Sequence, residues 1–125
     1  MLEDIFNIPC EIKINSEKFK AEYDFNSYAV LETLTGKGFY KLYNLLMVQN
    51  NLTLNDSVEI VCCSLLKHHS EKEVEKVREY LHKNPYAIQD LNSSVIGVFV
   101  APMLDPEIIK TVQGIKKKVE KIQIN

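Results

Sequence analysis

Hydrophobic and polar residues alternate over the first part of the chain, in the segment CEIKINSEKFKAEYDF at residues 10–25. The apolar side is formed by Cys10, Ile12 and Ile14 before the central NSEK, and by Phe19, Ala21, Tyr23 and Phe25 after it. A period of two is typical of half-buried strands, so the pattern predicts a β-hairpin. Because a two-stranded hairpin alone is marginally stable in water, its apolar face needs helices to cover it.

A helical period of three and four residues replaces the alternation from residue 26 onward. Asn26 is a suitable N-cap for the first helix, and Gly36 can take the left-handed conformation that ends it. The predicted apolar stripes are Val30, Leu31 and Leu34 in this helix, then Phe39, Leu42, Tyr43 and Leu46 in a second, shorter one.

The segment LTLNDSVEIVCCSLLKHH at residues 52–69 predicts the most buried helix. Thr53 and Asp56 have the spacing of a capping box at its start. Its apolar face is unusually wide, which places the helix at the centre of the fold. That face comprises Val58, Ile60, Val61, Cys62, Cys63, Leu65 and Leu66.

Three further start signals follow along the chain. Ser70 and Glu73 form another capping box, and Asn84-Pro85 and Asp105-Pro106 each place a cap residue before a proline. The apolar stripe of the first of these helices is Val74, Val77 and Leu81. The stripe of the second is Ile88, Leu91, Val95 and Phe99, and Pro102 ends that helix. The third helix is predicted to run to about Ile122.

The pattern as a whole predicts an α+β, mainly α fold. We expect a single domain over residues 1–125, with a β-hairpin at 10–25 and about six helices in the region 26–122. A chain of 125 residues can bury a core without disulfides or metals. The three cysteines are odd in number and two are adjacent, which fits a reducing cytoplasm better than a disulfide framework.

Charge and hydropathy argue against several classes of partner. The net charge of −2 is unlike that of a general nucleic-acid binder. The N-terminal MLEDIFNIPC lacks the basic region of a signal peptide, and no apolar run reaches the roughly 18 residues of a membrane span. We therefore expect a cytosolic protein without nucleic-acid or membrane partners.

Catalytic and metal-binding patterns are equally sparse. Cys62 and Cys63 point about 100° apart on a helix, and His69 lies two turns beyond Cys62, so these residues do not suit one metal ion. No serine lies in a G-x-S-x-G motif, and GKGF at residues 36–39 is not a phosphate loop. The segment 71–79 alternates glutamates with lysines and an arginine, which predicts a solvated helix face. Glu75 and Arg78 are one oppositely charged i, i+3 pair on it. The sequence predicts no enzyme, no cofactor and no metal.

One pattern near the C-terminus suggests a protein partner. Four apolar residues and a fifth beyond them are spaced 4, 3, 4, 3: Ile108, Val112, Ile115, Val119 and Ile122. This heptad spacing covers the domain's own core or docks on another helix, from a second copy or a client protein. Two heptads are fewer than the three or about four that a coiled coil requires, so both interpretations stay open.

The segment IKINSEKFKAEYDFNSYAVLETLTGKGFYKLYNLL, followed by LTLNDSVEIVCCSLLKH, resembles the tail assembly chaperones of long-tailed bacteriophages and prophages of Gram-positive bacteria. The resemblance rests on a hairpin at residues 12–26, an L-E-x-x-T-G-x-x-F helix end at 31–39 and an L-T-x-x-D helix start at 52–56. It covers roughly the first 70 residues. Ser16 departs from the family, which often has glycine there, and so leaves the turn type open.

The resemblance implies a non-enzymatic role. Such chaperones bind the tape measure protein, keep it soluble in the host bacterial cytoplasm until tail tube subunits polymerise, and are not expected in the mature virion. Many also occur in a longer, frameshifted form that recruits tail tube protein. Candidate contact residues here are Ile108, Val112, Ile115 and Val119, together with Phe39, Tyr40 and Tyr43.

Two alternatives to a tail assembly chaperone stay open. One is another structural or connector protein of the phage tail. The other is a small DNA-binding regulator, because helices at 26–35 and 39–48 joined by a glycine turn have the outline of a helix-turn-helix. The second helix, FYKLYNLLMVQN, offers a single lysine and no arginine for phosphate contacts, which disfavours the regulator.

Overall fold

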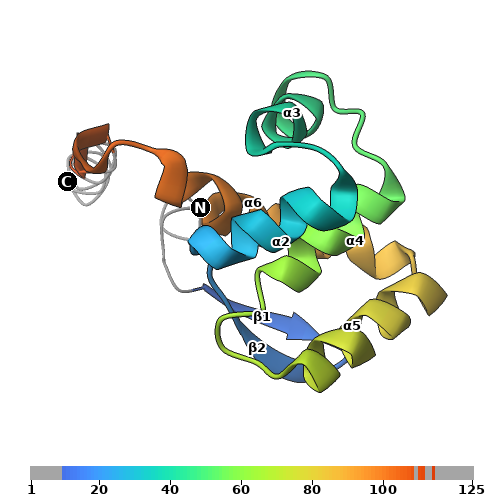
Figure 1. Ribbon diagram of the computed structural model, residues 1–125. Helices are drawn as coiled ribbons and strands as arrows, with labels where there is room; N and C mark the ends of the chain where they lie inside the picture. The colour runs from blue at the N-terminus through green and yellow to red at the C-terminus, as the bar shows by residue number, and fades with distance from the viewer. Residues whose placement is uncertain (1–9, 109, 112–113, 115–125) are drawn as a thin grey trace, which may run out of the picture.

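The computed structural model describes residues 10–108, 110, 111 and 114, and it begins with the hairpin (Figure 1). Strands β1 (Cys10–Ile14) and β2 (Glu17–Ala21) pair antiparallel, with Ile12 opposite Phe19. Both of these side chains are buried, as are Ile14, Ala21 and Tyr23, so the predicted apolar face is confirmed. The second strand is shorter than predicted: Phe25 is 89% exposed because it already belongs to the first helix.

The hairpin turn is of the primed type. Asn15 and Ser16 have φ angles of 50° and 68°, and Ile14 pairs with Glu17 across them. Positive φ at both central residues of a two-residue loop defines a type I′ turn, whose twist matches that of the strands. The turn forms although Ser16 carries a side chain where glycine would be relaxed.

Helix α2 (Phe25–Thr35) starts earlier than predicted, and its cap is Asp24 rather than Asn26. Asp24 Oδ1 accepts hydrogen bonds from the backbone N–H of Ser27 at 2.8 Å and from its hydroxyl at 2.9 Å. The predicted helix end is confirmed: Gly36 has φ 69° and donates its N–H to the carbonyl of Glu32. Of the predicted stripe, Leu31 is buried, Val30 is half-buried, and Leu34 is 53% exposed.

The second helical segment stands beside the main body (Figure 1). Helix α3 (Phe39–Tyr43) buries Phe39 and Leu42 and continues directly into a π-helical turn, η1 (Asn44–Val48). Lys37, in the loop before α3, reaches Asp56 with an Nζ–Oδ2 distance of 3.0 Å. This ion pair tethers the α2–α3 connection to the helix that follows η1.

Helix α4 (Leu54–Cys63) is the central element, as predicted, and packs against α2, α5 and α6. Its cap is half of the predicted capping box. The Thr53 hydroxyl accepts the N–H of Asp56 at 3.1 Å, but the Asp56 carboxylate pairs with Lys37 instead of returning to Thr53. Behind α4, the backbone N–H of Glu22 donates to the carbonyl of Ser64 at 2.8 Å and joins the hairpin to the end of the helix.

Helices α5 (Glu71–Lys83) and α6 (Tyr86–Val100) complete the main body. Both halves of the predicted capping box at Ser70 and Glu73 are present, and all seven predicted stripe residues of the two helices are buried. Asn84 does not cap α6: its side-chain amide donates to the Tyr80 carbonyl at the end of α5, and Pro85 takes the N-cap position. A 3₁₀ turn, η2 (Ala101–Met103), contains Pro102, and helical residues resume at 106.

An aromatic cluster joins four segments of the core. The rings of Tyr23, Tyr28, Phe39 and Phe99 have neighbouring centroids 4.8 to 6.1 Å apart. The two hydroxyls are satisfied inside the core, because Tyr23 donates to the Ile60 carbonyl and Tyr28 donates to the Phe99 carbonyl at 2.6 Å. The cluster therefore fixes α2, α3, α4 and α6 against the end of the hairpin. The predicted hairpin with helices packed on it is confirmed.

Candidate functional site

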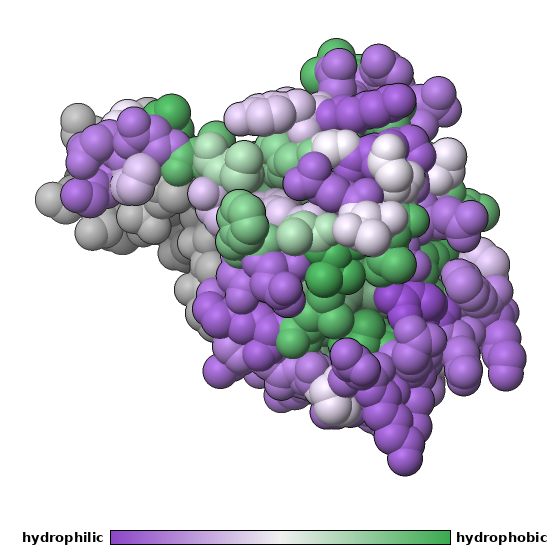
Figure 2. All heavy atoms as spheres, in the orientation of Figure 1, coloured by the Kyte–Doolittle hydropathy of each residue, from purple (hydrophilic) through white to green (hydrophobic). Residues whose placement is uncertain are grey.

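An apolar groove of about 450 Å³ lies between α2, α4 and α5. Figure 2 shows green, hydrophobic atoms on its floor between purple, hydrophilic rims. The residues that line it are Leu34, Glu59, Leu66, Glu71, Val74, Glu75 and Arg78. The groove is the leading candidate site because it is a concave surface with an exposed apolar side chain, Leu34, beside the half-buried Leu66.

Helix packing explains why the groove stays open. Helices α2 and α5 both pack chiefly on α4 rather than on each other, so a gap remains above α4. Val74 is buried at the bottom of the gap, Leu66 is half-buried, and Leu34 is exposed. Leu34 was predicted as a core residue, and it does lie on the inward side of α2. No element among the described residues covers it there.

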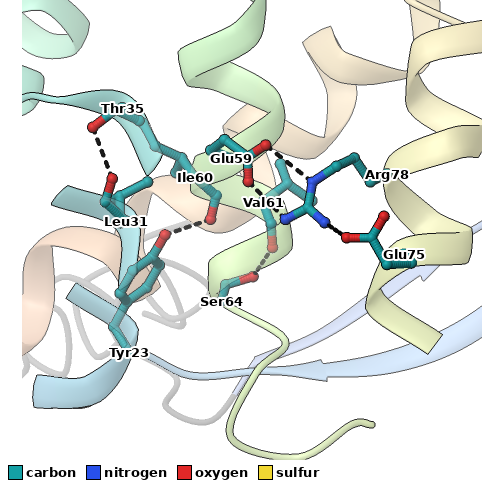
Figure 3. A network of polar contacts seen from close by, with 9 residues as sticks. All are labelled: Tyr23, Leu31, Thr35, Glu59, Ile60, Val61, Ser64, Glu75 and Arg78. Carbon is teal, nitrogen blue, oxygen red and sulfur yellow. Dashed lines mark hydrogen bonds and ion pairs between the residues drawn. The ribbon is translucent and has the colours of Figure 1, made fainter. Parts of the chain in front are cut away.

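Ion pairs set the polar rim (Figure 3). The guanidinium of Arg78 donates from Nε to Glu59 Oε2 at 3.0 Å and from Nη2 to Glu59 Oε1 at 2.8 Å. Its Nη1 contacts Glu75 Oε1, which confirms the i, i+3 pair expected from sequence. The hydrogen bonds that Arg78 donates to Glu59 raise the pKa of Arg78 above its usual value, so the rim cation is permanently charged. The Glu59 pair could not be predicted from local spacing, because Glu59 is on a different helix from Arg78.

The cysteines that sequence analysis considered for a metal site are buried. Burial raises the pKa of the Cys62 and Cys63 thiols to about 12, so both are protonated at neutral pH. Among the residues that the structure describes, no group of three or more His, Cys, Asp or Glu side chains is placed to hold a metal ion.

The two histidines after α4 contact the hairpin. His69 Nε2 accepts the backbone N–H of Lys20 at 2.9 Å, and His68 Nε2 lies 3.0 Å from Glu22 Oε1. Hydrogen bonds from Lys67 first, and from His68 second, lower the pKa of Glu22. These side chains therefore join the hairpin to the α4–α5 connection, a role that the sequence pattern did not indicate.

The predicted contact residues fall in different places. Phe39 is 8% exposed within the aromatic cluster, which corrects its assignment to a contact surface. Tyr40 is 76% exposed on α3, and Tyr43 is half-buried beside Phe39. Ile108 is 50% exposed. Val112, Ile115 and Val119 lie outside the described residues.

Of the predicted contact residues that the structure describes, Phe39, Tyr40, Tyr43 and Ile108, none lines the groove. Helical residues 106–108 lie at the end of the molecule opposite α5 (Figure 1). The sequence signal that could have identified the groove was the apolar Leu34, which follows Leu31 on the inward side of α2 and was assigned to the core.

In the described part of the chain, no helix is both long enough and apolar enough to cross a membrane. Comparison with known proteins gives no assignment: no protein-family model, no curated protein and no solved structure matches this chain.

Proposed function

We propose that this protein is a phage or prophage tail assembly chaperone, which binds the tape measure protein and keeps it soluble while the tail tube forms. The observation that carries the proposal is the open groove with an apolar floor at Leu34, Leu66 and Val74. It is supported by the sequence resemblance over the hairpin, the α2 end and the start of α4. A chaperone of this kind works by surface contact and needs no catalytic group.

The groove can act by covering apolar stripes of the client. A helix-rich chain aggregates when the apolar faces of its helices meet one another in solution. A helix seated on Leu34 and Leu66 buries such a face at roughly 25 cal/mol per Å² of apolar surface removed from water. Because the groove is shallow and its rim is charged, binding is reversible, and tail tube subunits can displace the chaperone as they polymerise.

The proposal places the protein in the host bacterial cytoplasm and outside the mature virion. Its partners are the tape measure protein and, through a longer frameshifted form, the tail tube protein. If purified tails retain the chain in stoichiometric amounts, the connector role replaces the chaperone role.

Co-expression with the tape measure protein from the same gene cluster tests the proposal. We expect the tape measure protein to become soluble and to copurify with the chain. Leu34→Glu places a charge on the groove floor and should reduce recovery roughly tenfold. Phe25→Glu is the matched control, because Phe25 is an exposed apolar residue of the same helix that does not line the groove. An unchanged, insoluble tape measure protein beside the wild-type chain would refute the proposal.

A further inference from the structure

We infer that the groove is selective for charge: it takes an amphipathic helix whose apolar stripe is flanked by lysine or arginine. The inference rests on the proposed function, since it names the chemistry of the client segment at the same groove. It is carried by the charges that line the groove and by their existing partners.

The lining of the groove is acidic. It contains three glutamates and one arginine, Glu59, Glu71, Glu75 and Arg78, and so has a net charge of −2. The single cation is already engaged, because Glu59 binds two nitrogens of Arg78 and Glu75 binds the third. Glu71 is exposed and forms no ion pair with any described residue. Among the described lining residues, the carboxylate of Glu71 and the second oxygen of Glu75 are therefore on offer to an incoming partner, and no cation is uncommitted.

The spacing of the carboxylates fits a helix. Glu71 and Glu75 are four residues apart on α5, so they lie on one side of that helix about one turn, or 5 to 6 Å, apart. A second helix lying alongside α5 has the same rise per residue and presents basic residues at i and i+4 with the matching separation. Its apolar stripe then faces Leu34 and Leu66.

The size of the groove fits one face of a helix. A volume of about 450 Å³ is in the range of small-ligand pockets and far below that of a complete helix about 10 Å across. The apolar side chains of the partner enter the groove, while its polar face stays in water. A stripe flanked by glutamate or aspartate would bring like charges to Glu71 and Glu75, which weakens binding.

Two synthetic helical peptides with one shared apolar stripe test this selectivity against the full chain. One has lysines on both sides of the stripe and the other has glutamates. We expect the lysine peptide to bind roughly tenfold tighter at low ionic strength, and the difference to shrink as salt screens the exposed charges. Fluorescence anisotropy of labelled peptides gives both dissociation constants. Equal affinities for the two peptides would overturn the inference.

Charge variants locate the effect in the groove. Glu71→Lys should reduce the preference for the lysine peptide at least threefold, and Leu34→Glu should weaken binding of both peptides roughly tenfold. Asp90→Lys makes the same change in net charge on an exposed residue of α6 that does not line the groove, and should leave the preference unchanged. If Glu71→Lys and Asp90→Lys behave alike, the preference is a property of net charge and the inference fails.

A second copy of this chain is the competing occupant. The stretch after Ile108 also combines isoleucine and valine with lysines 116, 117, 118 and 121. Sedimentation of the wild-type chain decides between a client helix and a second copy: a dimer that Leu34→Glu dissociates would assign the groove to self-association.

The failure of the proposed function can be distinguished from the failure of the charge selectivity. Peptide selectivity without recovery of the tape measure protein rejects the chaperone function alone, whereas recovery that depends on Leu34 and ignores Glu71 rejects the charge selectivity alone.

Discussion

Arg78 and Glu59 face each other across the junction of α5 and α4, with Arg78 Nη2 2.8 Å from Glu59 Oε1 and a second hydrogen bond of 3.0 Å beside it. Two parallel contacts between a guanidinium and a carboxylate fix orientation as well as distance. Both side chains are mostly shielded from water, at 19% and 17% exposed. The pair therefore determines how α5 sits on α4, and with it the shape of the groove.

Breaking this pair from one side should destabilise the protein. Arg78→Met leaves Glu59 partly buried without its partner, which we expect to lower the free energy of unfolding by about 2 kcal/mol. The double variant with Glu59→Met should recover part of that loss, because no unpaired charge remains. Urea denaturation of the two single variants and the double variant yields the coupling energy. Additive losses would mean that the two residues do not interact in solution.

A glycine in place of Ser16 should stabilise the hairpin turn. Ser16 has φ 68°, a left-handed conformation that costs a residue with a Cβ atom about 1 kcal/mol or more. Ser16→Gly removes that cost and should raise the free energy of unfolding by about 1 kcal/mol. Lys18→Gly, in the adjacent strand, should instead destabilise the protein. The midpoints of urea unfolding report both changes, and a loss of stability in Ser16→Gly would rule out the primed turn.

The role of Asp24 as the N-cap of α2 can be tested by deleting its side chain. Asp24→Ala should lower the free energy of unfolding by about 1 kcal/mol at neutral pH, the usual cost of removing an N-cap. Asn26→Ala should have little effect or stabilise slightly, since Asn26 lies inside the helix, where alanine is the better residue. Thermal unfolding of the two variants compares them directly. A larger loss for Asn26→Ala would restore the cap predicted from sequence.

The stabilisation of the folded state by Asp24 should depend on pH. Hydrogen bonds from Ser27, first from its backbone N–H and then from its hydroxyl, lower the pKa of Asp24. A lowered pKa in the folded state means that the stabilisation is complete above about pH 4, the value for an unfolded aspartate, and disappears as the pH falls through the folded value. The stability difference between wild type and Asp24→Asn should therefore shrink on acidification below about pH 4. A stability difference that stays constant across this pH range would contradict the cap role of the Asp24 carboxylate.

The buried thiols of Cys62 and Cys63 should resist chemical modification. Both side chains are fully buried and protonated, and the thiolate is the reactive form. In a Cys10→Ser background, reaction with a disulfide reagent should be slow in buffer and should accelerate with urea as α4 becomes exposed. The reaction of a short unfolded cysteine peptide is the reference rate. Reaction of the native protein at that rate would place these cysteines at the surface.

Local signals in the sequence were sufficient for much of the fold. Gly36 and the Ser70–Glu73 box were predicted correctly because a helix end is decided within about four residues. The cap of α2 was placed wrongly because Asp24 and Asn26 are both good caps, and only the backbone decides between them. The primed turn was left open because its usual glycine is absent.

Contacts between elements were beyond the sequence pattern. Periodicity identifies the apolar side of a helix and does not say whether a neighbour covers it. For this reason two members of predicted apolar stripes differ in burial: Leu34 is exposed and lines the groove, whereas Phe39, also a candidate contact residue, is buried in the aromatic cluster. The ion pairs of Glu59 with Arg78 and of Lys37 with Asp56 depend on how helices cross, which no local spacing encodes.

The attachment of both groove walls to α4 has a mechanical consequence. Because α2 and α5 meet mainly through that shared helix, and the Arg78–Glu59 pair holds α5 on it, the separation of the two walls is set by α4 and not by a contact of one wall with the other. A substitution that shifts α4 would therefore change the width of the groove without touching either wall.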